Sequence, residues 1–445
     1  MATVKETRNP ILQTVDGQQM RVTVVRPVGA TGGNVACEFG DSPSIDAFAR
    51  LRVSNPETLF DSKNIFNDPD LADTLENQPL FYDNQETAGG GTGTSYDNDK
   101  ACQFLSVSDT TAGTRVRQTK MRFNYQPGKS QLVLLTFVLG TQAAGITRRE
   151  GIFDESDGIY LEDTGSGYNL VRRSSGTGAV VNTSVARASW NIDPMDGTGT
   201  SGVTLDFTKT QILLIDYEWL GVGRVRIGFV IDGIPIYCHQ FLNANNLDLV
   251  YMQTPNLPLR SEITNDGTGP AATMSQICST VISEGGSQDL GSVRYASTAG
   301  THVDANTENT IYAIVGIRLK SAYLGASIKI LNAELAEHAG NKNYEWLLLL
   351  NPTVAGVFTY ADESQSAIQS AKGATANTVT GGYQITGGYA SSSVRGGTSS
   401  SQINNAIRLG SLIDGTPDEI VLCVRPVGGS TNLDIEGSLT WRELT

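Results

Sequence analysis

Cysteine and histidine are scarce in this 445-residue sequence, which narrows the chemistry that the chain can perform. The few residues of these types are Cys37, Cys102, Cys238, Cys278, Cys423, His239, His302 and His338. No two cysteines have the spacing of a zinc or redox motif, so we expect free, mostly buried thiols in a protein made in a reducing cytoplasm. The histidines fall in a predicted strand, a polar loop and a short turn or helix, without a GxSxG nucleophile motif. Neither residue type therefore points to a metal centre or a nucleophilic active site.

Positive charge is also sparse. The sequence has 32 Lys and Arg against 46 Asp and Glu, for a formal net charge of −14. Phosphate backbones are bound by clustered Lys and Arg, and the sequence has no such cluster, so we expect no nucleic-acid partner. The arginines of TRVRQTKMRFNY (114–125) instead alternate along a predicted strand, which indicates a solvated or intersubunit face.

Long apolar runs are missing as well. No window approaches the ~20 apolar residues of a membrane span. The first residues, MATVKETRNPILQ, lack the apolar core of a secretory signal. We therefore expect no membrane insertion and synthesis as a soluble cytoplasmic protein.

Strand patterns and turns are what the sequence has in abundance. Apolar alternation recurs at 114–125, 131–140, 158–163, 168–175, 211–219, 309–320 and 326–335. Helical patterns are short, around 44–51 and 332–339, and Gly/Ser/Thr/Asn-rich loops separate the strands. This combination predicts an all-β protein, an antiparallel β-sandwich of jelly-roll or lectin-like type with a second, smaller β-domain. We place an extended attachment arm at 1–44, the sandwich body at 45–340 and the C-terminal β-domain at 341–445.

The clearest local signal is the segment RVRIGFVIDGIPIYCHQF (224–241). Asp232-Gly233 at its centre predicts a type I′ turn, and hence a hairpin. The predicted register pairs Ile231 with Ile234, Phe229 with Ile236, Ile227 with Cys238 and Val225 with Gln240. Pro235 removes a ladder donor, which predicts an edge strand or a nearby bulge. A nucleotide-binding loop is the competing interpretation of the glycines in WLGVG (219–223), but a strand follows where that motif requires a helix.

The strongest enzymatic candidates are Asp216 and Glu218 in ILLIDYEWL. Spaced by two on a strand, they project from one face roughly 7 Å apart. Paired carboxylates at such distances perform glycoside hydrolysis. The alternative is a pair of solvated or salt-bridged carboxylates that meet Arg224 or Arg226, and we favour it because leucines occupy the flanking positions, Leu214 and Leu220.

Two further residue groups have a binding and a structural interpretation. The acidic loops DESDG (154–158) and NDPDLAD (67–73) could ligate Ca²⁺, although neither has the spacing of an EF-hand loop, and a solvated turn is favoured. Trp190, Trp219 and Tyr217 could stack on sugars, but buried core is the more frequent position of such residues on strands.

Several longer blocks of the sequence are distinctive: LRVSNPETLFDSK (51–63), FNYQPGKSQLVLLTF (123–137), WNIDPMDGTGTSGVTLD (190–206), WLGVGRVRIGFVIDG (219–233), QTPNLPLRSEI (253–263) and IVLCVRPVGGSTNLDIEGSLTW (420–441). Together they resemble virion structural proteins of tailed bacteriophages that are common in environmental and marine phage genomes. The resemblance implies a structural role in the virion and carries over no catalytic residues.

Together these observations predict a non-enzymatic virion subunit, in a tail fibre, a baseplate or a head-attached component, made in the host cytoplasm. We expect no catalytic, cofactor-binding or metal-binding residues and no cofactor. The expected partners are other virion structural proteins and further copies of the chain, most simply as a trimer, with the arm attaching by strand addition. The alternatives are a receptor- or glycan-binding lectin-like adhesin of the virion, and a glycan-cleaving enzyme that uses Asp216 and Glu218.

Overall fold

The computed structural model describes residues 11–15, 18–22, 55–64, 81–338, 342–391, 397–398 and 408–444. By its contacts the chain separates into two compact units, Met1–Asn55 and Pro56–Thr445. In the first unit, strands β1 (Ile11–Val15) and β2 (Gln18–Val22) form an antiparallel pair. Apart from this pair, the predicted arm at 1–44 and the predicted helix at 44–51 lie outside the described residues.

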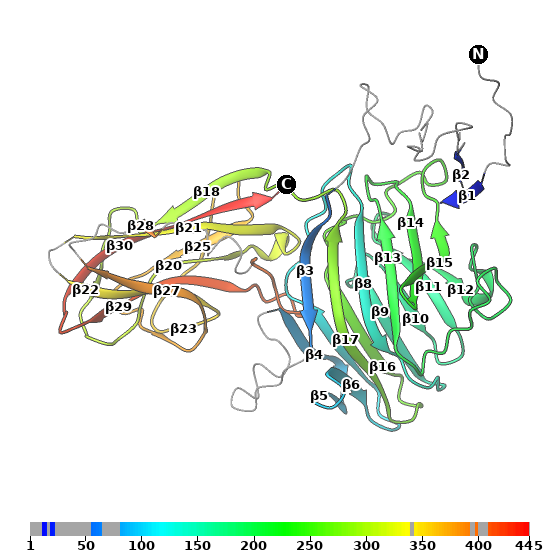
Figure 1. The fold of residues 1–445 in the computed structure, drawn as a ribbon. Helices are drawn as coiled ribbons and strands as arrows, with labels where there is room; N and C mark the ends of the chain where they lie inside the picture. Colours follow the sequence, from blue (N-terminus) through cyan, green and yellow to red (C-terminus); the bar gives the residue numbers. More distant parts are fainter. Residues whose placement is uncertain are drawn as a thin grey trace, which may run out of the picture. The chain divides into compact units, whose positions relative to one another are not determined.

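The second unit begins with a sandwich of two large sheets (Figure 1). The seven-stranded sheet has the order β12 (Val181–Ala186), β11 (Tyr168–Ser174), β10 (Gly158–Asp163), β9 (Ile146–Phe153), β16 (Leu259–Asn265), β7 (Gly113–Thr119), β4 (Tyr82–Gly89). The eight-stranded sheet has the order β15 (Ile234–Phe241), β14 (Val225–Ile231), β13 (Gln211–Tyr217), β8 (Gln131–Val138), β17 (Ala272–Ser283), β6 (Cys102–Val107), β5 (Thr92–Asp97), with β3 (Glu57–Lys63) beside β17. Every pairing of these strands is antiparallel, which confirms the predicted fold class.

Alternation along each strand produces the core of this sandwich. In β8, QLVLLTFV, the side chains of Val133, Leu135 and Phe137 are buried while their neighbours are half-buried. The inward side chains of both sheets form one apolar cluster, in which Ile152 of β9 and Leu213 of β13 are fully buried. A period of two with one face inward is the pattern of a sandwich strand.

The rest of the second unit is a smaller sandwich, whose sheets share a second core that contains the fully buried Trp441. Its five-stranded sheet contains β18 (Gly291–Ser297), β30 (Leu433–Leu444), β21 (Ser327–Glu337) and β28 (Gly397–Thr398) in that order, with β19 (Val303–Ala305) beside β30. Its six-stranded sheet has the order β24 (Ala361–Asp362), β25 (Ile368–Lys372), β20 (Tyr312–Leu319), β29 (Glu419–Val427), β22 (Asn343–Leu350), β27 (Tyr383–Ser391). A two-stranded sheet pairs β23 (Thr353–Val354) with β26 (Val379–Thr380).

These pairings differ from two sequence expectations. The boundary placed at residue 340 falls between β21 and β22, which belong to the two sheets of the same smaller sandwich. The polar stretch AEHAGNKN looked like a linker because it interrupts two apolar runs, but it joins consecutive strands of one domain. The helix expected at 332–339 is wrong, because residues up to Glu337 belong to β21 and pair with β30. Long-range strand pairing overrides the helix propensity of the sequence AELAE.

The predicted hairpin is confirmed, with a one-residue change in register. Asp232 and Gly233 have φ of 52° and 80°, as a type I′ turn requires. Pairing is as predicted at Ile231↔Ile234 and Phe229↔Ile236. A β-bulge then inserts one extra residue, Cys238, so that Ile227 pairs with His239 and Val225 with Phe241. As Pro235 predicted, the strand that contains it, β15, lies at the edge of its sheet and carries a bulge.

Helices are few. The described residues contain the three-residue 3₁₀ helices η2 (Arg187–Ser189) and η3 (Ser321–Tyr323). No helix within the described part of the chain has the length and apolar character of a membrane span.

Candidate functional site

Asp216 and Glu218, the predicted acidic pair, sit in different surroundings. Asp216 lies in β13 with a side chain that is buried, whereas Glu218 follows the strand and is exposed. The Asp216 carboxylate forms an ion pair with Arg226 of β14 and accepts a hydrogen bond of 3.0 Å from the Tyr237 hydroxyl. Oε1 of Glu218 accepts the backbone N–H of Arg224 at 3.2 Å. Asp216 is therefore salt-bridged and Glu218 is solvent-exposed, as the structural alternative described them.

A larger charged cluster lies on the outer face of the seven-stranded sheet. Arg149 of β9 stands opposite Glu162 of β10 on one side and Glu262 of β16 on the other. Its Nε lies 2.9 Å from Glu162 Oε1, and its Nη1 pairs with Glu262. Arg260 pairs with Glu262 and with Glu155, each at 2.6 Å. We call these five residues the arginine–glutamate row.

The row favours the ionised form of Glu262. Burial raises the pKa of Glu262, but Arg260 and Arg149 outweigh it, so that the pKa lies below its ordinary value. A glycosidase needs one carboxylic acid that is protonated near neutral pH. The lowered pKa of Glu262 works against that role, and its carboxylate serves instead to join neighbouring strands.

Aromatic rings on the same face are covered by arginines. Phe153, Tyr160 and Val171 form a small cluster of fully buried side chains. The guanidinium of Arg173 lies 5.1 Å from the centre of the Tyr160 ring, and that of Arg260 lies 5.4 Å from Phe153. Such contacts are cation–π interactions. Because the rings are covered, they offer no open face for stacking on a sugar.

The interior of the larger sandwich contains a further charged group. Arg117 of β7 is fully buried, with its Nε 3.2 Å from Gln276 Oε1 and its guanidinium 3.9 Å from the centre of the Tyr82 ring. The predicted solvated or intersubunit position is therefore wrong for this arginine. Beside it, burial raises the pKa of Glu150 to about 8, against smaller opposing effects of Ser261 and Arg117. This carboxyl is therefore mostly protonated at neutral pH.

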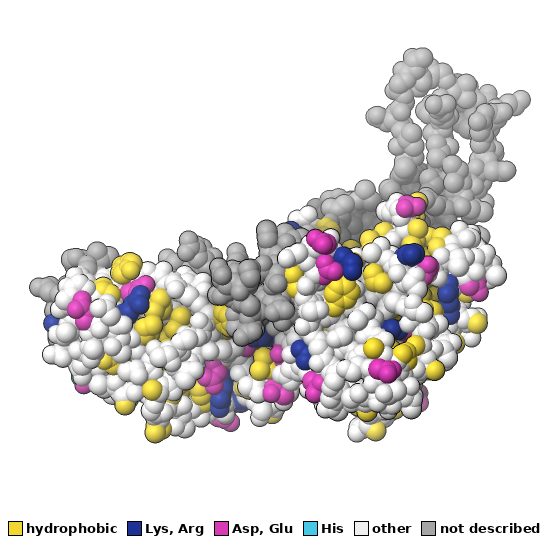
Figure 2. All heavy atoms as spheres, turned by 90° about the horizontal axis from the view of Figure 1, so that it is seen from below, with side chains coloured by type: hydrophobic (Ala, Val, Ile, Leu, Met, Phe, Trp, Pro, Cys, Tyr) yellow, Lys and Arg dark blue, Asp and Glu magenta, His cyan; other side chains and the backbone are white. Residues whose placement is uncertain are grey.

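Neither charged cluster was foreseen from the sequence. ITRREGIF, YLED and RSEIT carry opposite charges, but the signal appears only when the strand register places Arg149 between Glu162 and Glu262. Figure 2 shows acidic and basic side chains side by side in small groups on the face in view, without an extended basic area.

Exposed apolar side chains gather on two loops that are in contact. The loops follow β13 and β15, and their exposed members are Leu220 (55 %), Val222 (40 %), Leu242 (54 %), Leu249 (52 %) and Val250 (37 %), which we call the loop patch. The Tyr251 N–H donates to the carbonyl of Gly221 at 2.9 Å, and the side-chain amide of Asn243 donates to the carbonyl of Gly223 at 2.6 Å. Hydrogen bonds therefore hold the two loops together.

The first of these loops has an unusual backbone. Leu220 has φ of 36°, which is strained for a branched side chain, and Gly221 follows with φ of 76°. Strand β14 begins at Val225, so no helix terminus faces these glycines and the nucleotide-binding interpretation fails. The strained loop presents an apolar side chain to solvent.

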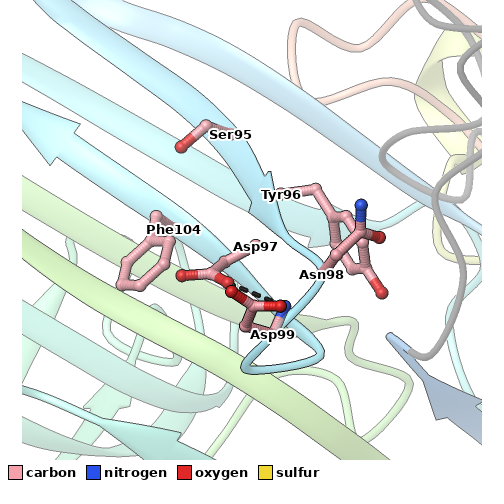
Figure 3. Close-up of a pocket in the computed structure, with 6 residues that line it drawn as sticks. All are labelled: Ser95, Tyr96, Asp97, Asn98, Asp99 and Phe104. Atoms are coloured by element: carbon pink, nitrogen blue, oxygen red, sulfur yellow. Dashed lines mark hydrogen bonds between the residues drawn. The ribbon is translucent and has the colours of Figure 1, made fainter.

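A polar hollow of 480 Å³ lies at the turn between β5 and β6 (Figure 3). Its lining is mostly polar and consists of Ser95, Tyr96, Asp97, Asn98, Asp99 and Phe104. Asp97 is partly engaged, since its Oδ1 accepts the backbone N–H groups of Asp99 and Lys100 at 3.0 and 3.1 Å. The remaining hydroxyl, amide and carboxylate groups could bind a hydroxyl-rich ligand.

The acidic loop at 154–158 behaves as a turn. Asp154 accepts the N–H groups of Ser156 and Asp157 and pairs with Arg122. Asp157 accepts hydrogen bonds from the backbone and hydroxyl of Ser175. Their carboxylate oxygens are thus used inside the fold, whereas the other acidic loop, 67–73, lies outside the described residues.

The aromatic residues proposed for sugar stacking belong to the core of the larger sandwich. Trp190 and Tyr217 are buried, and Trp219 packs against the same cluster with its indole N–H donating to the Met252 carbonyl at 3.0 Å. The core interpretation of these three residues is confirmed.

The described cysteines are free thiols as predicted, whereas two histidines lie unexpectedly close together. Cys102, Cys238, Cys278 and Cys423 are free thiols, as predicted, and Cys37 lies outside the described residues. Burial lowers the pKa of His239 to about 4, so this ring is neutral. His302 and His338, which the sequence did not connect, have ring centres 5.5 Å apart.

Comparison with known proteins gives likeness in strand arrangement alone. No family model and no curated protein matches the sequence. A glycoside hydrolase family 16 endo-glucanase from Bacteroides ovatus is 10% identical, with a TM-score of 0.33. The matched region covers 50% of this chain and 99% of the endo-glucanase chain. The CBM2 module of the evolved Dit of Lactobacillus casei BL23 phage J-1 is 8% identical (TM-score 0.34; 53% and 100% covered). A legume lectin-like domain from Entamoeba histolytica is 12% identical (TM-score 0.27; 46% and 91% covered).

Proposed function

We propose that this protein is a non-enzymatic structural subunit of a tailed-phage particle that assembles through its surface loops with other copies of itself, as a trimer, and with other virion proteins. The observation that supports it most is the loop patch. The resemblance of the sequence blocks to virion structural proteins supplies the setting.

The physical argument rests on exposure. Apolar side chains from two hydrogen-bonded loops present themselves together to solvent, and contiguous apolar patches on soluble proteins mark interaction sites. Leu220 is exposed in a left-handed backbone conformation. This conformation carries a strain of order 1–3 kcal/mol, which persists only where the surrounding structure enforces it. Burial of these five side chains against a neighbouring subunit would remove their apolar surface from water, which favours association.

The charged residues support a role without catalysis. Asp216, one of the two carboxylates of the strongest enzymatic interpretation, is paired with Arg226, and Glu262 is paired with Arg149 and Arg260. An acid–base pair for glycan cleavage requires two carboxyl groups with divergent pKa values facing one substrate.

The test is to measure oligomeric mass in variants of the loop patch. Leu220→Ser with Leu249→Ser should lower the mass from that of a trimer toward that of a monomer in light scattering, while the melting temperature stays within about 2 °C. Val357→Ser is the matched control, because Val357 is 83 % exposed on the smaller sandwich. A wild-type monomer at micromolar concentration, or an unchanged oligomer in the double variant, would contradict the proposal.

A second candidate function is glycan binding by a virion adhesin, and the polar hollow at β5–β6 favours it. Ser95, Asp97, Asn98 and Asp99 offer hydroxyl, amide and carboxylate groups beside the ring of Phe104. Binding of host-surface glycans on an array, lost in Asp99→Ala and Phe104→Ala, would support it. A blank array would leave assembly as the function of the chain.

A further inference from the structure

Two of the three histidines in the chain meet three carboxylates on the smaller sandwich. His302 precedes β19, His338 follows β21, and Asp304, Asp434 and Glu436 lie in β19 and β30. One ligand atom each from His302, Asp304 and Asp434 lie within 4.8 Å of one another. Residues far apart in sequence thus converge at one edge of the five-stranded sheet.

We propose that His302, Asp304 and Asp434 form a binding site for a divalent transition metal of the zinc class. Imidazole nitrogen and carboxylate oxygen are the ligands that Zn²⁺ takes in tetrahedral sites, at about 2.0–2.2 Å. Such bonds separate ligand atoms by roughly 3.4 Å. The ligand atoms of His302, Asp304 and Asp434 lie within 4.8 Å of one another, so small side-chain rotations bring them to this separation.

The protein already holds both rings by carboxylates. His338 Nε2 lies 2.6 Å from Glu436 Oε1, and His302 Nε2 lies 3.0 Å from Asp304 Oδ1. A metal-ligating histidine commonly has its second ring nitrogen bonded to a carboxylate, which fixes the ring orientation and raises its basicity. Glu436 holds His338 in this way beside the site, with the ring centre of His338 5.5 Å from that of His302.

The strand register supplies a reason for a cation. Asp304 and Asp434 stand directly opposite each other in the antiparallel pair of β19 and β30. Like charges in this position destabilise a sheet. A divalent cation between the two carboxylates converts repulsion into attraction, and ties together β19 and β30.

This arrangement predicts that one substitution has opposite effects on the melting temperature of the metal-free protein and on the stabilisation by Zn²⁺. Asp434→Asn removes the repulsion, so it should raise the melting temperature of the metal-free protein. It also removes a ligand, so it should abolish the rise that Zn²⁺ produces in the wild type. A carboxylate with a purely structural role would not show a reversal that depends on the metal.

The experiment uses the full chain, stripped with chelator, and titrates Zn²⁺ by calorimetry and Co²⁺ by visible absorption. We expect one ion per chain, a Co²⁺ spectrum with the intensity of tetrahedral coordination, and a higher melting temperature with Zn²⁺. His302→Ala should weaken binding at least tenfold, whereas His338→Ala, which removes a ring beside the site, should have a smaller effect. Both side chains are about half exposed, so the fold should persist, which far-ultraviolet circular dichroism checks.

The matched control is Asp248→Asn, an exposed carboxylate on the larger sandwich, which should leave the affinity unchanged. Ca²⁺, which prefers oxygen ligands, should compete poorly. Absence of Zn²⁺ binding at 100 µM, or an affinity unaffected by His302→Ala, would overturn the proposal. Loss of the Zn²⁺ effect without loss of trimer assembly would separate this site from the proposed function.

Discussion

Replacing Phe229 by alanine should strongly destabilise the larger sandwich. The Phe229 ring is fully buried, stacked on Trp190 at 6.4 Å and edge-on to Phe207 at 5.7 Å. Truncation of a buried phenylalanine leaves a cavity and costs ~3–5 kcal/mol. At about 2–4 °C per kcal/mol for a domain of this size, the melting temperature should fall by roughly 6–20 °C.

The control lies on the same hairpin. Ile234 pairs with Ile231 next to the turn, and its side chain is 64 % exposed, so Ile234→Ala should change stability by less than about 0.5 kcal/mol. Calorimetry should resolve the two sandwiches, and only the transition that contains Trp190 should move. A Phe229→Ala protein that melts within 2 °C of the wild type, or an equal loss in Ile234→Ala, would refute the buried position of Phe229 and the exposed position of Ile234.

Three further predictions follow from single sites. Gly233→Val should cost ~1–3 kcal/mol from backbone strain alone, since a Cβ there meets nothing within 4 Å; an unchanged denaturation midpoint would exclude the type I′ turn. Because burial raises the pKa of Glu150 to about 8, the stability it contributes is complete below its unfolded pKa near 4.5 and lost as pH rises to 8. Glu150→Gln should thus match the wild type at pH 4.5 and melt at a higher temperature at pH 8.5, and equal melting curves at pH 8.5 would count against a protonated Glu150. Asp216→Asn with Glu218→Gln should leave assembly and infectivity intact, whereas glycan cleavage by the wild type that disappears in this double variant would establish the enzymatic alternative.

The sequence predicted those features of the fold that depend on a few neighbouring residues. The turn at Asp232-Gly233 was predictable because two consecutive positive φ angles demand these residue types. The register beyond Phe229 was not, because the bulge at Cys238 depends on outside contacts: its carbonyl accepts the N–H groups of Ile192 and Asp193. A neighbouring segment thus decided the pairing of Ile227.

Features that depend on long-range pairing were harder to predict. The domain boundary failed to match the sheets because polarity at AEHAGNKN does not reveal whether β21 and β22 share a core. Arg117 could not be placed from its alternation, since a strand face is buried or solvated according to what packs on it. Likewise, the meeting of His302 with His338 depends on the pairing of β19 and β21 with β30. The ion pair of Asp216 with Arg226 was predictable because the two residues lie on strands joined by a short loop.

The most direct test of the proposed function is a cryo-electron-microscopy reconstruction of the purified phage particle that carries this chain. The account predicts density for both sandwiches in symmetric copies, with Leu220 and Leu249 covered by a neighbouring subunit. Particles that lack the chain, or that hold it with these two side chains open to solvent in every copy, would contradict it.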